Sequence, residues 1–124
     1  MAKILVVEDE RTTWKLLEYK LTRAGHDLFW AGDGLQALEL AREKIPTLIL
    51  LDLMIPSPDG IRVLKILKED EKLKSIPVII LSALSLEENI IAGLELGAED
   101  YLTKPFSPEE LLLRIDRTLN RLQD

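Results

Sequence analysis

The chain has 124 residues, of which 47% are hydrophobic and 31% charged, and this predicts one soluble globular domain. The net charge of −6 argues against general affinity for nucleic acid or anionic membranes, because both favour a basic surface. The chain has no cysteine and one histidine, which excludes disulfides, thiolate metal sites and histidine clusters, so a bound metal would need oxygen ligands. The start of the sequence fits neither a signal peptide nor a membrane span, and we expect a cytoplasmic location.

The first quarter of the chain predicts a strand, a helix and a second strand. Lys3 to Val7 is a short apolar run that ends at the acids Glu8, Asp9 and Glu10, which is typical of a buried strand. Asp27 to Trp30 is less apolar and is expected nearer a sheet edge. Between the two strands, a helix that ends at Gly25 would bury Trp14, Leu17, Leu21 and Ala24.

The next elements follow the same alternation. Asp33 and Gly34 open a helix that Pro46 stops. Leu48 to Leu51 is a continuous apolar run that leads into Asp52 and a turn rich in proline and glycine, which predicts a strand buried on both faces. Asp59 can cap the following helix. The inward residues are Ala37, Leu38, Ala41 and Ile45 in the first of these helices and Ile61, Leu64 and Leu67 in the second.

The last part of the chain predicts two more strands and two more helices. Val78 to Leu81 is the fourth buried run, and Ser85 to Glu88 fits a capping box for a helix that Gly97 ends. Glu99 to Leu102 is the last and shortest strand. Ser107 and Pro108 fit the start of a final helix. That helix would bury Leu111, Leu112, Ile115, Leu119 and Leu122 and keep Arg114, Arg117 and Arg121 in water.

Five strands that alternate with five helices predict an α/β fold with a parallel sheet and helices on both faces. The sequence shows no internal repeat, low-complexity tract or linker, so residues 1–124 are expected to form one domain.

Parallel strands end at one edge of a sheet, and this brings the reactive residues together. Glu8, Asp9, Asp52, Ser82 and Lys104 all follow or end predicted strands and would face one crevice. Three carboxylates repel one another unless a cation lies among them, and magnesium is the usual ion for an oxygen site of this size. Lys104 would pair with an incoming anion.

The sequence resembles the receiver domain of bacterial two-component response regulators over its whole length. The motifs are Val-Val-Glu8-Asp9-Glu10, Leu-Asp52-Leu-Met54-Ile-Pro56 with Asp59-Gly60, Ile-Leu-Ser82-Ala83, and Gly-Ala-Glu-Asp-Tyr101-Leu-Thr-Lys104-Pro105-Phe106. The resemblance implies a doubly wound (βα)5 flavodoxin-like fold with strand order 2-1-3-4-5.

The resemblance also implies the site. Asp52 would accept a phosphoryl group from a histidine kinase or phosphotransfer protein. Magnesium, with manganese as the alternative ion, would be bound by Asp9, Asp52 and the backbone carbonyl of Met54, and by Glu8 through water. Ser82 and Lys104 would contact the phosphoryl oxygens.

Lys104 is followed by Pro105, and the resemblance implies that the bond between them is cis. Ser82 and Tyr101 would form a switch that moves the surface made by the helix after Ser85, the last strand and the last helix. A downstream protein or a second copy of the chain would bind there. Exposed Ile90 or Ile91 would favour an apolar contact.

Other functions remain as alternatives. The chain could be the receiver part of a larger DNA-binding response regulator. It could also be an aspartate-nucleophile phosphatase, but such an enzyme needs an acid two residues after the nucleophile, and Met54 stands there. A flavin-binding protein is disfavoured because Glu8 to Glu10 would repel a phosphate. We therefore expect a signalling domain and not an enzyme.

Overall fold

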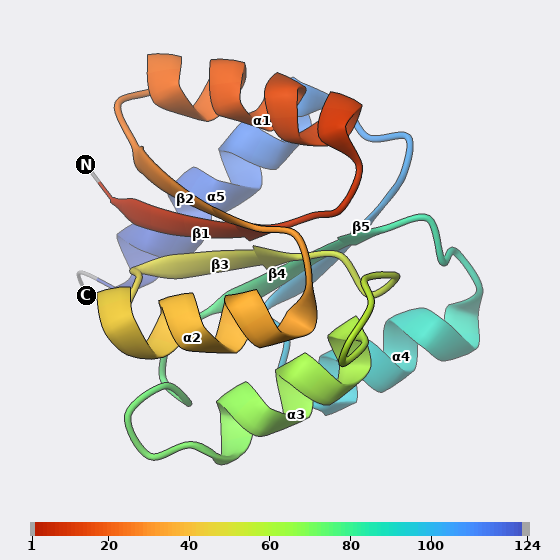
Figure 1. The fold of residues 1–124 in the computed structure, drawn as a ribbon. Helices are drawn as coiled ribbons and strands as arrows, with labels where there is room; N and C mark the ends of the chain where they lie inside the picture. The colour runs from red at the N-terminus through yellow and green to blue at the C-terminus, as the bar shows by residue number, and fades with distance from the viewer. Residues whose placement is uncertain (1, 123–124) are drawn as a thin grey trace.

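The computed structural model describes residues 2–122, and its centre is a parallel sheet of five strands in the order β2-β1-β3-β4-β5 (Figure 1). The strands are β1 Lys3–Val7, β2 Asp27–Ala31, β3 Leu48–Leu51, β4 Val78–Ser82 and β5 Asp100–Thr103. The helices are α1 Arg11–Arg23, α2 Gly34–Lys44, α3 Gly60–Glu69, α4 Glu87–Glu95 and α5 Pro108–Leu122. The predicted fold and strand order are confirmed, and β2 lies at an edge as expected.

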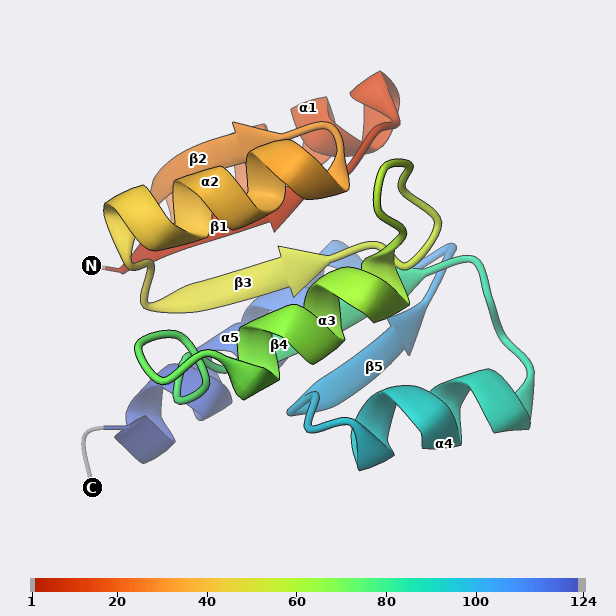
Figure 2. The ribbon, with the colours of Figure 1, turned by 60° about the horizontal axis from the view of Figure 1, so that its bottom comes forward.

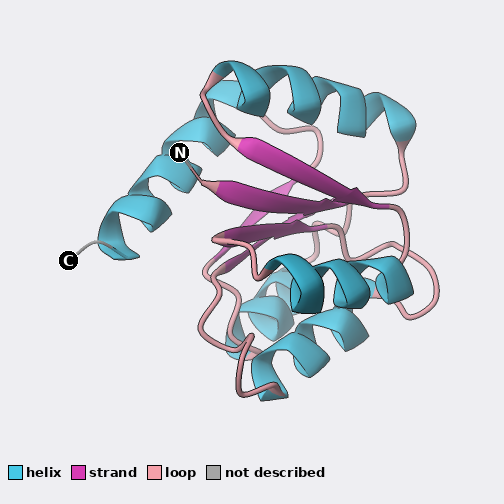
Figure 3. Cartoon of the chain, turned by 60° about the vertical axis from the view of Figure 1, so that its left-hand side comes forward, coloured by secondary structure: helices cyan, strands magenta, loops and turns pink. Residues whose placement is uncertain are grey.

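Helices cover both faces of the sheet, α1 and α5 on one side and α2, α3 and α4 on the other (Figures 1 and 2). The view from the side shows the strands as a layer between the two sets of helices (Figure 3). Successive side chains of a strand point to opposite faces, so each central strand contributes to two cores. In β1, Ile4 and Val6 pack with α1 and α5, whereas Leu5 and Val7 pack with α2 and α3.

The N-termini of the helices follow the predicted caps in three cases and differ in one. Asp33, Asp59 and Ser107 accept backbone N–H groups of the first turns of α2, α3 and α5. The predicted capping box at Ser85 is wrong, because α4 begins at Glu87 with Leu86 as its N-cap and no side-chain hydrogen bond. Ser85 lies one residue too early to cap this helix. Two acids in the first turn of α4, Glu87 and Glu88, instead interact favourably with the helix dipole.

Several residues predicted to face the core are exposed. Ile45 is 45% exposed, because α2 ends before Pro46, which disfavours the right-handed helical conformation of the residue before it; Ile45 is the C-cap and has a left-handed conformation. Ala24 lies beyond the end of α1 and is exposed. Leu122 is 53% exposed, and Thr118 is buried in α5 instead. A periodic apolar stripe gives the orientation of a helix, but burial also needs a surface that covers it.

Candidate functional site

The strand ends bring together the side chains that the sequence singled out. Because all five strands run parallel, their carboxyl ends meet at one edge of the sheet (Figure 1). Glu8 directly follows β1, and its N–H donates to Ala31 O. Asp52 directly follows β3, and its N–H donates to Val7 O. The two acids thus continue the backbone ladder of the sheet and are held as rigidly as the strands.

Three carboxylates form a cluster at this edge. Oxygen atoms of Glu8, Asp9 and Asp52 all lie within 4.8 Å of one another. Glu8 is 1% exposed and Asp52 is 5% exposed, whereas Asp9 is open to solvent. Burial raises the pKa of Glu8, although the hydrogen bond from Lys104 opposes this. A cluster of two buried acids and one exposed acid suits a hard divalent cation that keeps part of its water shell.

Lys104 supplies positive charge to the cluster. Its ammonium lies 2.7 Å from Glu8 Oε1, 3.0 Å from Asp52 Oδ2 and 3.3 Å from Glu10 Oε1. Burial alone would lower the pKa of Lys104, but the hydrogen bonds to Glu8 and Asp52 and the attraction of their negative charges outweigh burial and raise this pKa. The lysine therefore remains charged, and its backbone is held by a hydrogen bond from Lys104 N to Ser82 O at 2.9 Å. The bond from Lys104 to Pro105 is cis, as expected, and Ser57–Pro58 is a second cis bond, which was not predicted.

Glu10 is a member of the site that the sequence did not single out. Its N–H donates to Glu8 Oε2 at 3.0 Å, and its carboxylate accepts from Thr13 Oγ1 at 2.8 Å. The hydrogen bonds from Thr13 and Lys104 lower the pKa of Glu10. The position directly after two acids at a strand end was the available signal, but the contact with Lys104 spans 94 residues and depends on the fold.

The two oxygens of Asp52 have different partners. Met54 N–H donates to Oδ1 at 2.9 Å and the Lys104 ammonium donates to Oδ2 at 3.0 Å. The Met54 peptide thus lies beside the carboxylate, while the Met54 side chain is 55% exposed. Two donors at two oxygens fix the plane of this carboxylate.

Ser82 and Tyr101 meet at the loop after β4. Ser82 Oγ accepts from Leu84 N at 3.3 Å, and Tyr101 Oη donates to Leu84 O at 2.7 Å. The tyrosine is 8% exposed, and burial raises its pKa. An added Cβ at Gly93 of α4 would lie 3.3 Å from the Tyr101 ring, so the absence of a side chain there leaves room for the ring. One loop residue thus connects the strand-end hydroxyl with the aromatic side chain under α4.

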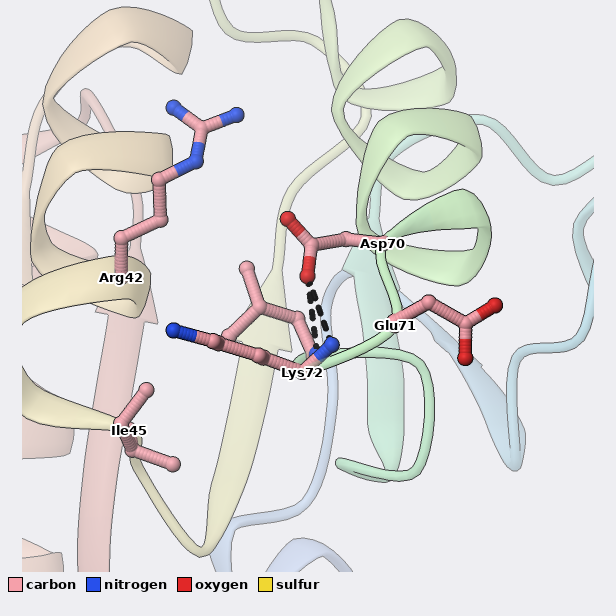
Figure 4. Close-up of a pocket in the computed structure, with 6 residues that line it drawn as sticks. Arg42, Ile45, Asp70, Glu71 and Lys72 are labelled. Carbon is pink, nitrogen blue, oxygen red and sulfur yellow. Dashed lines mark hydrogen bonds between the residues drawn. The ribbon is translucent and has the colours of Figure 1, made fainter.

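A cavity of about 480 Å³ lies away from the strand-end cluster. It is lined by residues at the end of α2 and in the loop after α3: Arg42, Ile45, Asp70, Glu71, Lys72 and Leu73 (Figure 4). Asp70 Oδ1 accepts from Lys72 N at 2.8 Å and from Leu73 N at 3.2 Å, so this acid is used to close the loop. A different depression, of about 410 Å³, adjoins the strand-end cluster at Glu10 and Lys104.

Comparisons with known proteins agree with this geometry. The family model of the response regulator receiver domain matches residues 4–116. The chain is 46% identical over 119 residues to the alkaline phosphatase synthesis transcriptional regulatory protein PhoP of Bacillus subtilis, covering 96% of this chain and 49% of PhoP. It therefore spans about half the length of the curated relatives it matches.

Solved structures show the same similarity. A Francisella response regulator receiver domain is 41% identical, with a TM-score of 0.92 over 98% of this chain and 99% of that one. The receiver domain of a Pseudomonas aeruginosa sensor histidine kinase, with magnesium in its active site cleft, is 30% identical, with a TM-score of 0.88 over 96% of this chain and 98% of that one. Among residues 2–122, no helix combines the length and apolar content needed to cross a membrane. The chain belongs to the family of response regulator receiver domains.

Proposed function

We propose that this receiver domain accepts a phosphoryl group on Asp52 from the phosphohistidine of a histidine kinase or of a phosphotransfer protein. The observation that carries the proposal is the Asp52 carboxylate, which lies at a strand end with one oxygen bonded to Met54 N–H and the other to Lys104. Phosphoryl transfer needs an aligned oxygen nucleophile and compensation of negative charge, more than it needs covalent machinery. The Asp52 carboxylate would supply the oxygen nucleophile, and the ammonium of Lys104 would compensate negative charge.

The acidic cluster fits magnesium, with manganese as the alternative ion. Asp9, Asp52 and the Met54 carbonyl would hold the ion, and Glu8 would contact it through water. When bound, the ion compensates charge on the phosphoryl oxygens. The magnesium in the related receiver domain of the Pseudomonas sensor kinase supports this assignment.

The transfer itself uses residues of this chain. An oxygen of Asp52 forms the new P–O bond while the P–N bond of the donor breaks, and the electron pair stays on the imidazole. The product is an acyl phosphate, which adds negative charge beside Lys104 and Ser82. Lys104 would exchange its contact with Asp52 Oδ2 for a phosphoryl oxygen, and the Ser82 hydroxyl would donate to another.

The output would pass through the loop after β4. If Ser82 turns toward the phosphoryl group, it gives up its bond to Leu84 N, and the Leu84 carbonyl that holds Tyr101 moves as well. Tyr101 lies against α4, so the surface formed by α4, β5 and α5 would change. Ile91 is 46% exposed and Leu94 43% exposed on α4, which suits an apolar contact with a downstream protein or a second copy of the chain.

A second candidate function is the receiver part of a larger DNA-binding regulator. PhoP carries the name of a transcriptional regulatory protein, and this chain spans 49% of it. In that case the same switch would control an attached domain. The net charge of −6 disfavours direct nucleic acid binding by residues 1–124. We propose that these residues form one receiver domain that acts in the cytoplasm. The domain would not catalyse reactions on other substrates.

The test is incubation with a small-molecule phosphodonor, with and without magnesium, followed by intact-mass measurement. We expect a phosphoryl mass increment in the wild type that needs magnesium and is absent in Asp52→Asn. Asp59→Asn is a matched control, because asparagine also caps a helix and this acid lies outside the cluster. Equal labelling of the wild type and Asp52→Asn would overturn the assignment.

A further inference from the structure

Two tryptophans join α1, β2 and the acidic loop. Trp14 of α1 and Trp30 of β2 stack with ring centroids 5.2 Å apart and planes 5° apart. The indole Nε1–H of Trp30 donates to the backbone carbonyl of Glu8 at 2.7 Å, across 22 residues of sequence. Trp30 is 40% exposed, yet its only polar atom points to the backbone and not to solvent.

The indole takes the place of a backbone donor where the edge strand has ended. β2 ends at Ala31, whose carbonyl accepts from Glu8 N, and the next N–H, that of Gly32, donates to the side chain of Gln36. The Glu8 carbonyl is therefore held by the Trp30 side chain. The N–H and the carbonyl of Glu8 are thus both hydrogen-bonded to residues of β2.

This contact holds the peptide that leads into Asp9. The Glu8 carbonyl belongs to the peptide that joins Glu8 to Asp9, and a peptide unit is planar and rigid. The Glu8 carboxylate has its own partners in Lys104 and Glu10 N. The Asp9 side chain is exposed, and two neighbouring carboxylates repel it, so its place in the cluster depends on its backbone.

We propose that Trp30 is a positioning residue of the magnesium site: its indole N–H fixes the Glu8–Asp9 peptide, and the stack on Trp14 holds the indole in place. Asp9 is thereby kept near Glu8 and Asp52 before the ion arrives, so less ordering is required on binding. This inference rests on the proposed magnesium site. A purely structural role for the two rings would predict lower stability on substitution but unchanged metal affinity.

The experiment compares Trp30→Phe with Trp14→Phe by calorimetric titration of the purified chain with magnesium chloride. Each variant replaces one indole by a smaller ring, but only Trp30→Phe removes the donor to Glu8. Loss of an outer contact that orients a metal ligand typically weakens affinity tenfold or more, so we expect about a tenfold loss in Trp30→Phe. We expect a smaller loss in Trp14→Phe, which keeps a ring for stacking. Equal affinities of Trp30→Phe and the wild type, or equal losses in both variants, would overturn the inference.

A second measurement keeps the test independent of whether the variants fold. The chain has two tryptophans, so their indole N–H signals can be assigned by nuclear magnetic resonance. The Trp30 signal of the wild type should exchange with solvent much more slowly than a free indole, because its hydrogen is bonded to Glu8. Exchange at the rate of a free indole would refute the contact. A wild type that binds no magnesium would overturn the proposed metal site together with this inference, whereas magnesium binding that is insensitive to Trp30→Phe overturns the inference alone.

Discussion

The ammonium of Lys104 lies 2.7 Å from Oε1 of Glu8, although 96 residues separate them in the chain. The Glu8 side chain is 2% exposed and that of Lys104 is 14% exposed, so the pair is largely removed from water. A buried acid needs such a partner, because loss of one member leaves a charge without compensation. The pair therefore links the stability of the fold to the charge state of the site.

The first prediction concerns removal of this partner. In buffer that contains a metal chelator, the free energy of unfolding of Lys104→Gln should be about 3 kcal/mol lower than that of the wild type at pH 8. The loss should be smaller at pH 5. Burial already raises the pKa of Glu8, and without Lys104 this pKa rises further. In the folded variant Glu8 then keeps its proton at pH values at which the unfolded chain, with a Glu8 pKa near 4.5, has released it. The free energy of unfolding of the variant therefore falls as the pH rises above 4.5.

Urea unfolding at several pH values measures this effect. Lys74→Gln is the control, because its pair with Glu71 is exposed and should contribute less than about 1 kcal/mol at any pH. The link between Lys104 and Glu8 would be refuted if Lys104→Gln lost the same stability at pH 5 and pH 8.

The second prediction concerns magnesium and Asp9. Magnesium at ten times its Kd should stabilise the wild type by about 1.4 kcal/mol, because it binds the folded state. Asp9→Asn should lose this stabilisation. Without magnesium, however, the variant should be more stable than the wild type, because one of three neighbouring carboxylates is gone. Thermal unfolding with magnesium or chelator measures both effects, with Asp33→Asn, an N-cap of α2 outside the cluster, as control. A full magnesium response in Asp9→Asn would contradict the assigned ligand.

The third prediction concerns the close approach of α3 to the loop after Asp52. A Cβ at Gly60 would lie 2.3 Å from Leu53 Cα and 2.5 Å from Asp52 O, both backbone atoms that cannot move away cheaply. Gly60→Ala should destabilise the domain by about 1–3 kcal/mol, measured by urea unfolding. Gly32→Ala is the matched control, because its Cβ would meet only Gln36 Oε1 at 3.8 Å. Similar stabilities of the two variants would show that the loop yields easily.

The fourth prediction concerns the hydroxyl of Tyr101. Tyr101→Phe keeps the ring but removes the 2.7 Å bond to Leu84 O, which should cost about 1 kcal/mol of stability. The loop after β4 should also open more often, and faster amide hydrogen exchange at Leu84 would report this. Tyr19→Phe is the control, since Tyr19 is 57% exposed on α1. Unchanged exchange at Leu84 would indicate that the ring holds the loop without the hydroxyl.

Local patterns were sufficient for the elements of the fold. The run Leu48–Leu51 became β3 with all four residues buried, and Asp59 capped α3, because a continuous apolar run predicts a strand covered on both faces and an N-cap bonds the next turn of its own helix. The predicted capping box at Ser85 was wrong, because α4 begins at Glu87 with Leu86 as its N-cap and no side-chain hydrogen bond at that position.

The sequence by itself determined the order of the elements and which strands end in an acid, a hydroxyl or an amine, because hydrophobic periodicity and turn residues are local properties. Parallel pairing then brought Glu8, Asp52 and Lys104 to one edge, as expected. Only the tertiary structure decided which atoms meet: Lys104 shared among three acids, Tyr101 bonded to Leu84, and Trp30 bonded to the Glu8 carbonyl. These contacts join residues 17 to 96 positions apart, and their distances follow from how the strands pair and how the loops at their carboxyl ends fold, and not from spacing along the chain.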